Sequence, residues 1–303
     1  HKEYRRQRQM CIRDSYPIKC IAIPKTVDND LALTDCCPGF GSAAKYIATS
    51  ILEASLDVES MFETSTKVFI LEVMGRHAGW MAASSALAKT PKRDAPHIIL
   101  LPEIIFNQKK FLSKVKDVIA KKGYCVIVAS EGIKNSKGNF LSESDTKDAF
   151  GHAQLGGVAP YLSSLVSKKL KLKNHWAVSD YLQRSARHIA SNTDLLHAEA
   201  VGAHAIKYAI SGMNGVMPII VRGKGKKYTW KIEPAPLSKI ANLEKKLPKS
   251  FITKDGLNVN KKAIDYLMPL ISGENFPEFK NGIPKIEELK LVKVKKRLSK
   301  WKP

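Results

Sequence analysis

Two aspartates, Asp28 and Asp30, are separated by one residue in the segment PKTVDND at 24–30, directly after the apolar run IKCIAI at 18–23. On an extended segment, side chains two positions apart point the same way, so one carboxylate can act as a base while the other helps to hold Mg²⁺. The β-branched run predicts a buried strand that Pro24 ends, because proline cannot donate to a sheet ladder. The segment therefore predicts acid–base chemistry beside a cation at the carboxyl end of a strand.

Three further polar clusters follow apolar runs: MGRHAGW at 74–80, Glu131-Gly132, and DYLQRS at 180–185. Arg76 and Arg184 can each fork onto a phosphate group, and Glu131 can accept hydrogen bonds from sugar hydroxyls. Gly75 and Gly132 allow the backbone to approach a ligand closely. Because loops at the carboxyl ends of parallel strands open on one edge of a sheet, we expect the four clusters to converge on one crevice.

Each of these residues also has a simpler interpretation when it is taken alone. An aspartate after a strand is more often a turn or helix cap, and an arginine is more often in a surface ion pair. His77 and Trp80 are interpreted as structural residues, and the pair Cys36–Cys37 as inert thiols. The convergence of four clusters favours a functional site over these separate interpretations.

The elements that must position these clusters alternate along the chain. Strands are predicted at 68–73, 97–103, 124–132 and 215–221, and a strand followed by a loop at 175–184. Helices are predicted at 39–57, 77–89, 111–121, 155–172, 194–212 and 261–271. Thr34 or Asp35 is the expected cap of the first of these helices. Strands that alternate with helices of ten or more residues predict βαβ units, and hence an α/β fold with a mostly parallel sheet.

Composition excludes several classes of protein. The chain has 303 residues and 44% hydrophobic residues, which is enough for two domains or one large α/β domain, and it has no apolar run long enough for a membrane span. The five cysteines, at 11, 20, 36, 37 and 125, show no CxxC spacing. This pattern argues against a disulfide framework or a zinc site, and with no visible secretory signal it indicates a cytoplasmic protein.

The net charge of +22 raises the alternative of a nucleic-acid partner. The lysines are scattered, with clusters at 168–173, 224–227 and 290–302, and none of these clusters is interleaved with stacking aromatic residues. No helix-turn-helix, zinc-finger or RNP motif accompanies them. The charge is therefore interpreted as a solvated lysine-rich surface with a basic tail, and no nucleic-acid partner is expected.

Taken together, PKTVDND, EVMGRHAGW, SEG and DYLQRS resemble the motifs of the phosphofructokinases, and in detail those of the pyrophosphate-dependent type. The resemblance covers roughly residues 16–290 and includes DAFGHAQLGGVAPYL at 148–162 and ARHIASNTD at 186–194. It implies two Rossmann-like lobes with the active site between them. It also implies Mg²⁺-dependent, reversible phosphoryl transfer from pyrophosphate to the 1-hydroxyl of fructose 6-phosphate, by a homo-oligomer, either a dimer or a tetramer.

The resemblance assigns catalytic roles to four residues. It implies that Asp28 accepts the proton of the sugar 1-hydroxyl and that Asp30 helps to organise Mg²⁺. Arg76 is expected to contact the transferred phosphoryl group. Lys25 stands where many ATP-using relatives carry glycine, so it is expected to fill the space of the nucleotide's α-phosphate and to stabilise pyrophosphate as donor and leaving group.

The resemblance also implies a set of substrate-binding residues. These are Thr26, Val27, Asp28, Met74, Gly75, Arg76, Glu131, Tyr181 and Arg184. Within this set, Glu131 is expected to hold sugar hydroxyls, and Tyr181 and Arg184 are expected to hold the 6-phosphate. Tyr181 stands where many ATP-dependent relatives carry histidine.

Three segments are predicted along the chain: a non-native or disordered stretch at 1–15, a catalytic core at 16–223, and a C-terminal helical extension at 224–303 that packs on the core. The family's GGDD or GGDG segment, which lies upstream of PKTVDND, is not found. The chain is therefore expected to be an inactive, N-terminally truncated fragment whose first lobe is incomplete and which lacks the main Mg²⁺ ligand. The alternatives are an ATP-dependent phosphofructokinase and a non-catalytic relative that binds sugar phosphates.

Overall fold

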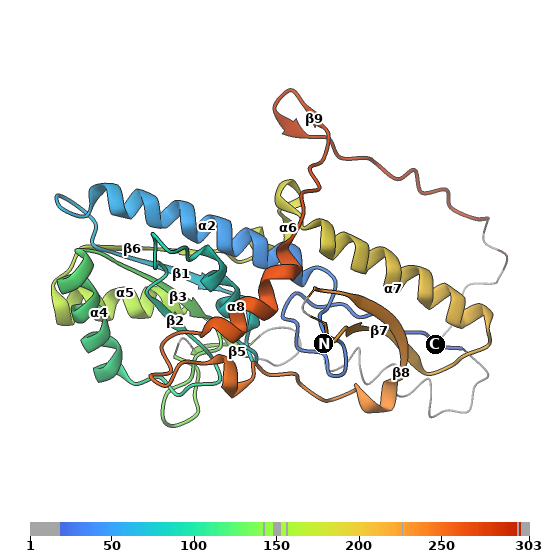
Figure 1. Ribbon diagram of the computed structural model, residues 1–303, viewed down its shortest axis with the longest axis horizontal. Coiled ribbons are helices and arrows are strands. Elements are labelled where there is room, and N and C mark those ends of the chain that lie inside the picture. Colours follow the sequence, from blue (N-terminus) through green and yellow to red (C-terminus); the bar gives the residue numbers. More distant parts are fainter. Residues whose placement is uncertain are drawn as a thin grey trace.

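The computed structural model describes residues 19–141, 143–147, 153–155, 157–225, 227–295 and 297. The predicted stretch 1–15, and residues 148–152 and 156 of DAFGHAQLGGVAPYL, lie outside the described residues. Two layered units lie side by side along the long axis of the molecule, one around a four-stranded sheet and the other around helix α7 and a two-stranded ribbon (Figure 1). The four polar clusters of the sequence lie on both units.

The four-stranded sheet is parallel throughout, as the sequence predicts. Its strands, in spatial order, are β2 (Ile98–Leu100), β3 (Cys125–Ser130), β1 (Val68–Val73) and β6 (Asn174–Val178). The register sets Val73 opposite Ser130, and Glu72 opposite Val178. Strands β1, β3 and β6 therefore end nearly level, so the loops that follow them start at one edge of the sheet.

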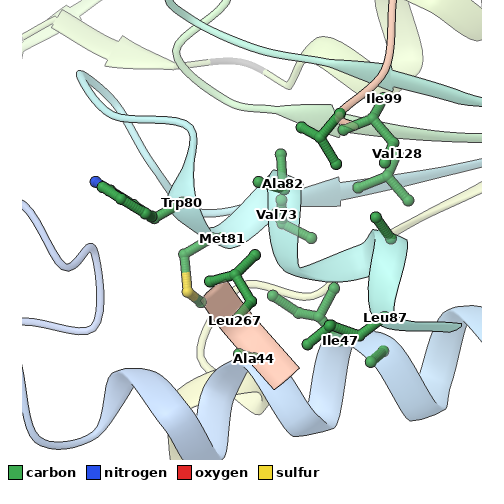
Figure 2. Close-up of a cluster of buried hydrophobic side chains, with 14 of the residues drawn as sticks. Ala44, Ile47, Val73, Trp80, Met81, Ala82, Leu87, Ile99, Val128 and Leu267 are labelled. Carbon is green, nitrogen blue, oxygen red and sulfur yellow. The ribbon is translucent and has the colours of Figure 1, made fainter. Parts of the chain in front are cut away.

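Helices cover both faces of this sheet, because successive strand residues point to opposite sides. On one face, Val73, Val128 and Ile99 pack against Ala44 and Ile47 of α2 (Phe40–Met61), as Figure 2 shows. On the other face, α4 (Gln108–Lys122) and α5 (Val158–Leu170) bury their apolar sides against the alternate strand residues. The sheet is thus the middle layer of three, and its strands are held rigidly.

The second unit contains α7 (Asn192–Ile210) and an antiparallel ribbon of β7 (Val216–Arg222) and β8 (Trp230–Pro236). The expected strand at 18–23 lies beside this ribbon, but the prediction of a strand was wrong. In the described residues it forms a single parallel bridge, Ile21 to Val216, and Ile23 is 47% exposed. Pro24 ends the pairing too early for a ladder to extend.

The remaining elements are short. They are α3 (Trp80–Ser84), α6 (Leu182–Ser185), α8 (Lys261–Leu267), the 3-10 turns Ser85–Ala88, Arg187–Ile189, Leu237–Lys239, Lys249–Phe251 and Met268–Ile271, and the strands β4 (Glu143–Lys147), β5 (Ala153–Leu155), β9 (Phe279–Lys280) and β10 (Ile283–Pro284). The helix predicted at 77–89 is thus a short α-helix followed by a 3-10 turn. Of the helices in the described ranges, none is long and apolar enough to cross a lipid bilayer.

The cap of α2 differs from the sequence expectation. The helix begins after Gly39, whose φ is 99°, and the cap is supplied by Asp194 from the first turn of α7. The Asp194 carboxylate accepts hydrogen bonds from the amide of Gly39 (2.9 Å) and from the amide and hydroxyl of Ser42 (3.0 and 2.6 Å). This long-range cap ties the two units together at the start of α2.

Candidate active site

The four polar clusters come together across the seam between the two units. PKTVDND leaves the bridge beside β7, whereas the other three clusters follow β1, β3 and β6. The expectation that all four follow strands of one sheet was therefore wrong, because the first cluster belongs to the other unit. The charges of Lys25, Arg76 and Arg184 nevertheless all act on the carboxylate of Asp28.

Asp28 is a half-buried carboxylate among three cations. Burial, helped by the neighbouring charge of Asp30, raises the pKa of Asp28 to about 6. The cations Lys25, Arg76 and Arg184 oppose this rise and favour the ionised form. Its amide donates to the hydroxyl of Thr26 (3.2 Å), which fixes the turn. A carboxylate with a pKa just below neutrality is ionised at pH 7 and basic enough to take a proton.

Glu131, at the end of β3, is the second carboxylate of the site. Burial and the nearby Asp28 raise the pKa of Glu131 to about 7, while Arg76 and a hydrogen bond from the Gly75 amide (3.4 Å) oppose the rise. The hydroxyl of Ser130 donates to the carbonyl of Gly75 (2.5 Å). The loops after β1 and β3 are therefore joined directly, with Glu131 beside Arg76.

Glycine is required where these two loops touch. A Cβ on Gly132 would lie 2.0 Å from the carbonyl oxygen of Arg76 and 2.7 Å from that of Gly75. Gly75 has a φ of 128°, and a Cβ there would lie 2.7 Å from the carbonyl oxygen of Ala78. Backbone atoms cannot move aside as the end of a flexible side chain can, so a side chain at either position would displace the Arg76 loop.

Gln183 connects the loop after β6 to the loop after β1. Its side-chain amide is buried, donates to the carbonyl of Asp180 (2.8 Å) and accepts from the amide of Met74 (3.3 Å). Beside it, the guanidinium of Arg184 lies 4.2 Å from the ring centroid of Tyr181, which is 62% exposed. Tyr181 and Arg184 thus form an exposed aromatic–cationic pair above a fixed turn.

The sequence reasoning did not find Gln183. Its neighbours in DYLQRS carry the ring and the charge, and an isolated glutamine has no spacing that marks it as buried. The apolar Leu182 before it is exposed while Gln183 is buried, which is the reverse of what polarity alone predicts.

The remaining residues of PKTVDND lie in the same loop as Asp28. Lys25 is exposed, and Val27 packs against the hydrophobic cluster between α2 and the sheet. The carbonyl of Asp30 accepts from the backbone amide of Lys245 (2.7 Å). In the part of the chain that the structure describes, no three His, Cys, Asp or Glu side chains form a metal-binding group. Asp28 and Asp30 remain as a carboxylate pair, and Mg²⁺ is commonly held by one or two carboxylates together with substrate phosphates.

A family model described as phosphofructokinase matches residues 2–209. The chain belongs to the phosphofructokinase family. The match begins within the stretch 1–15, which lies outside the described residues, and it includes every cluster described above.

Similar members of the phosphofructokinase family are bacterial. The pyrophosphate--fructose 6-phosphate 1-phosphotransferase of Xanthomonas campestris pv. campestris (strain B100) is 55% identical over 288 residues, which are 94% of this chain and 69% of that protein. The Halomonas elongata protein of the same name is 52% identical over 294 residues, or 97% of this chain and 70% of that protein.

A solved structure agrees with the fold. The crystal structure of the pyrophosphate-dependent phosphofructokinase from Nitrosospira multiformis superposes with a TM-score of 0.88 at 51% identity, over 97% of this chain and 70% of that chain. The chain thus spans about 70% of the length of these phosphofructokinases. The two-lobed phosphofructokinase fold expected from the sequence is confirmed.

Proposed function

We propose that the protein transfers a phosphoryl group from pyrophosphate to the 1-hydroxyl of fructose 6-phosphate, which gives fructose 1,6-bisphosphate and orthophosphate. The observation that carries this proposal is the setting of Asp28, a carboxylate with a pKa of about 6 under the charges of Lys25, Arg76 and Arg184. The names of relatives that are more than 50% identical support the same reaction.

In the proposed step, the sugar O1 attacks the phosphorus of the donor and loses its proton to the Asp28 carboxylate. The new O1–P bond forms as the bond from phosphorus to the bridging oxygen breaks, and the leaving phosphate keeps that electron pair. Arg76 and Lys25 neutralise charge on the transferred and leaving groups. The chain contributes position and charge to the reaction and forms no covalent intermediate.

The sugar phosphate is proposed to lie over the sheet edge. Glu131 accepts hydrogen bonds from sugar hydroxyls when it is ionised, and the glycine contact behind it fixes its direction. Tyr181 and Arg184 hold the 6-phosphate, since a guanidinium and a phenol hydroxyl both donate to phosphate oxygens. Thr26, Val27, Met74 and Gly75 complete the wall between the two units.

Mg²⁺ is the proposed metal, and Asp30, with Asp28 beside it, is the side chain placed to help hold it. Burial raises the pKa of Asp28, and the charge of Asp30 adds to this rise, as one acid does beside another. Asp30 and Asp28 would hold Mg²⁺ at this place, and the chemistry that it would supply is to offset the negative charge of the donor phosphates. The chain's own residues orient the acceptor and take its proton.

Assembly and location are also proposals. We infer a homo-oligomer, because the edge strand β6 presents the exposed side chains of Trp176 and Val178. A reducing cytoplasm fits Cys20, Cys36, Cys37 and Cys125, which are all free thiols. Light scattering of the complete gene product would measure the oligomeric state.

The test is formation of fructose 1,6-bisphosphate by the complete gene product with Mg²⁺, with pyrophosphate or ATP as donor. Turnover with pyrophosphate and none with ATP is the expected result. Turnover with ATP alone would be consistent with fructose 6-phosphate as acceptor and Asp28 as base, but would overturn pyrophosphate as the donor. Binding of fructose 6-phosphate without turnover on either donor would show a non-catalytic sugar-phosphate-binding protein.

A further inference from the structure

A lysine outside every motif of the site, Lys245, has its ammonium at the back of the PKTVDND loop. The ammonium donates to the carbonyl of Asp35 (2.8 Å), the carbonyl of Thr34 (2.9 Å) and the side-chain oxygen of Asn29 (3.1 Å). All three donors of the ammonium are therefore used. Burial lowers the pKa of Lys245, while the neighbouring thiols and acids favour its charged form.

The backbone of the same residue joins the two units. Its amide donates to the carbonyl of Asp30 (2.7 Å), and its carbonyl accepts from the indole of Trp80 (2.9 Å), at the end of MGRHAGW. Two residues later, the Leu247 amide donates to the Glu103 carboxylate (2.9 Å), which also accepts from the Gly79 amide (2.9 Å). The segment 244–247 therefore crosses from the loop with the two acids to the loop with Arg76.

Asn29 connects Lys245 to the two aspartates, Asp28 and Asp30. It is fully buried, stands between Asp28 and Asp30, and has a φ of 54°, a left-handed conformation that asparagine tolerates better than most residues. Its side-chain oxygen accepts from both the Lys245 ammonium and the Cys37 amide (3.0 Å). Because this turn directs the carboxylates on either side of it, whatever holds Asn29 also sets where they point.

A purely structural role would not require a cation here. Placing an ammonium away from water is costly, and the three oxygens that it binds, together with the nearby charges of Asp35 and Asp30, offset this cost. An apolar side chain could fill the same space, but those oxygens would lose the hydrogen bonds of the ammonium. What an apolar side chain cannot do is hold three oxygens of one turn at fixed distances. Lys245 binds both the Asn29 side chain and the Asp30 carbonyl, which belong to the two residues that follow Asp28.

We propose that Lys245 is a positioning residue for phosphoryl transfer, which acts through Asn29 and the carbonyls of Thr34 and Asp35 to hold the carboxylates of Asp28 and Asp30 in their working orientation. The inference rests on the proposed function. It concerns the transfer step, because Lys245 contacts neither the Arg184 loop nor Glu131 in the hydrogen bonds of the described residues.

The experiment compares Lys245→Met with Lys246→Met, its exposed neighbour, in the complete gene product with Mg²⁺ and pyrophosphate. The expected result for Lys245→Met is a fall in kcat of roughly 10²-fold, the cost of a small misplacement of catalytic groups. The KM for fructose 6-phosphate should stay close to the parent value. Lys246→Met should match the parent. Thermal melting and circular dichroism would give the folded fraction, by which kcat is corrected.

Asn29→Gly provides a second variant, since glycine accepts the positive φ and removes the side-chain oxygen that accepts from Lys245 and Cys37. It should lower kcat as Lys245→Met does, and the double variant should fall no further than the single ones, because residues that act together are not additive. This variant also decides the matter if Lys245→Met does not fold. Corrected kcat values equal to the parent, or additive losses, would overturn the role of Lys245.

The two proposals fail in different ways. A parent protein that turns over neither pyrophosphate nor ATP would overturn the proposed function and, with it, the role of Lys245. A parent that turns over pyrophosphate, with unchanged kcat in Lys245→Met and Asn29→Gly, would overturn only the role of Lys245.

Discussion

A single carboxylate, Asp28, is the residue on which turnover should depend most. We expect Asp28→Ser to lower kcat by roughly 10²–10⁴-fold, the usual contribution of a general base. Fructose 6-phosphate should still bind, since Glu131 and Arg184 remain. Steady-state kinetics and calorimetric binding would measure both quantities, with Asp57→Ser, an exposed acid on α2, as the control. A kcat near the parent value would show that another group takes the proton.

Lys25 should decide the use of the donor. It is exposed beside Asp28, so its ammonium is free to meet a phosphate. We expect Lys25→Gly to lower kcat with pyrophosphate by roughly 10²-fold, as the loss of one charge-stabilising donor does, without a matching change in the KM for fructose 6-phosphate. A matching loss of kcat with pyrophosphate and of affinity for fructose 6-phosphate would mean that Lys25 only shapes the loop.

At the scale of single residues, the sequence reveals charged side chains that stand next to apolar runs. The sequence could predict that Arg76, Glu131 and Arg184 lie near one edge of the sheet, because each follows a strand of the parallel sheet. Asn29 and Gln183 could not be predicted, since their roles come from burial and from partners far along the chain. Nothing in the local sequence distinguishes Lys245 from the neighbouring Lys246.

At the scale of elements, the contact between the loops after β1 and β3 should be the least tolerant part of the site. We expect Gly132→Ala to displace the Arg76 carbonyl, to abolish most turnover, and to lower the free energy of unfolding by roughly 1–3 kcal/mol, the usual cost of overpacking. Gly202→Ala is the matched control, because a Cβ there meets nothing within 4 Å on helix α7.

The control should be slightly more stable than the parent, by about 0.5–1 kcal/mol, since alanine favours a helix interior over glycine. Urea denaturation and steady-state kinetics would measure the two variants together. A Gly132→Ala protein with parental turnover would show that the two loops can separate without loss of the site.

The elements themselves could largely be predicted. The parallel sheet follows from β-branched runs that alternate with amphipathic helices, and β1, β3 and α4 lie within a few residues of their expected bounds. The failures are the strand at 18–23, the cap of α2 and strand β8. In each case the local pattern was outweighed by a distant partner, or by prolines such as Pro234 that disguise an edge strand.

At the scale of the whole molecule, a buried polar network joins the second unit to the start of α2. Arg222 pairs with both carboxylate oxygens of Asp35 (3.0 Å each) and lies against the rings of Tyr228 and Tyr266, at 4.5 and 4.0 Å. His197 stands between the Tyr228 hydroxyl (3.2 Å) and the Cys36 thiol (3.4 Å). The relation between the two units thus depends on groups that titrate.

His197 should make stability depend on pH. Burial lowers the pKa of His197 from 6.5 to about 4. Between these values the unfolded chain binds a proton that the folded chain does not, so the free energy of unfolding falls as pH falls through this window. The free energy of unfolding of the parent, minus that of His197→Gln, should fall by roughly 3 kcal/mol between pH 7 and pH 4.

Chemical denaturation of the parent and the variant across this range measures the difference directly, and other titrating groups cancel in the comparison. His188→Gln, at an exposed position, is the matched control for the change of residue type. A difference for His197→Gln that is independent of pH would show that His197 binds its proton equally well in the folded and unfolded chains, and that burial does not lower its pKa.

The bond from Lys245 to Asn29 also has a consequence for the order of synthesis. The two residues are 216 positions apart, and the bridge from Ile21 to Val216 spans nearly as far. At ordinary rates of translation, the acids of PKTVDND leave the ribosome roughly 10–40 s before the lysine that holds their turn. The nascent chain can build its parallel sheet early, but the turn of PKTVDND gains its bond to Lys245 only late in synthesis.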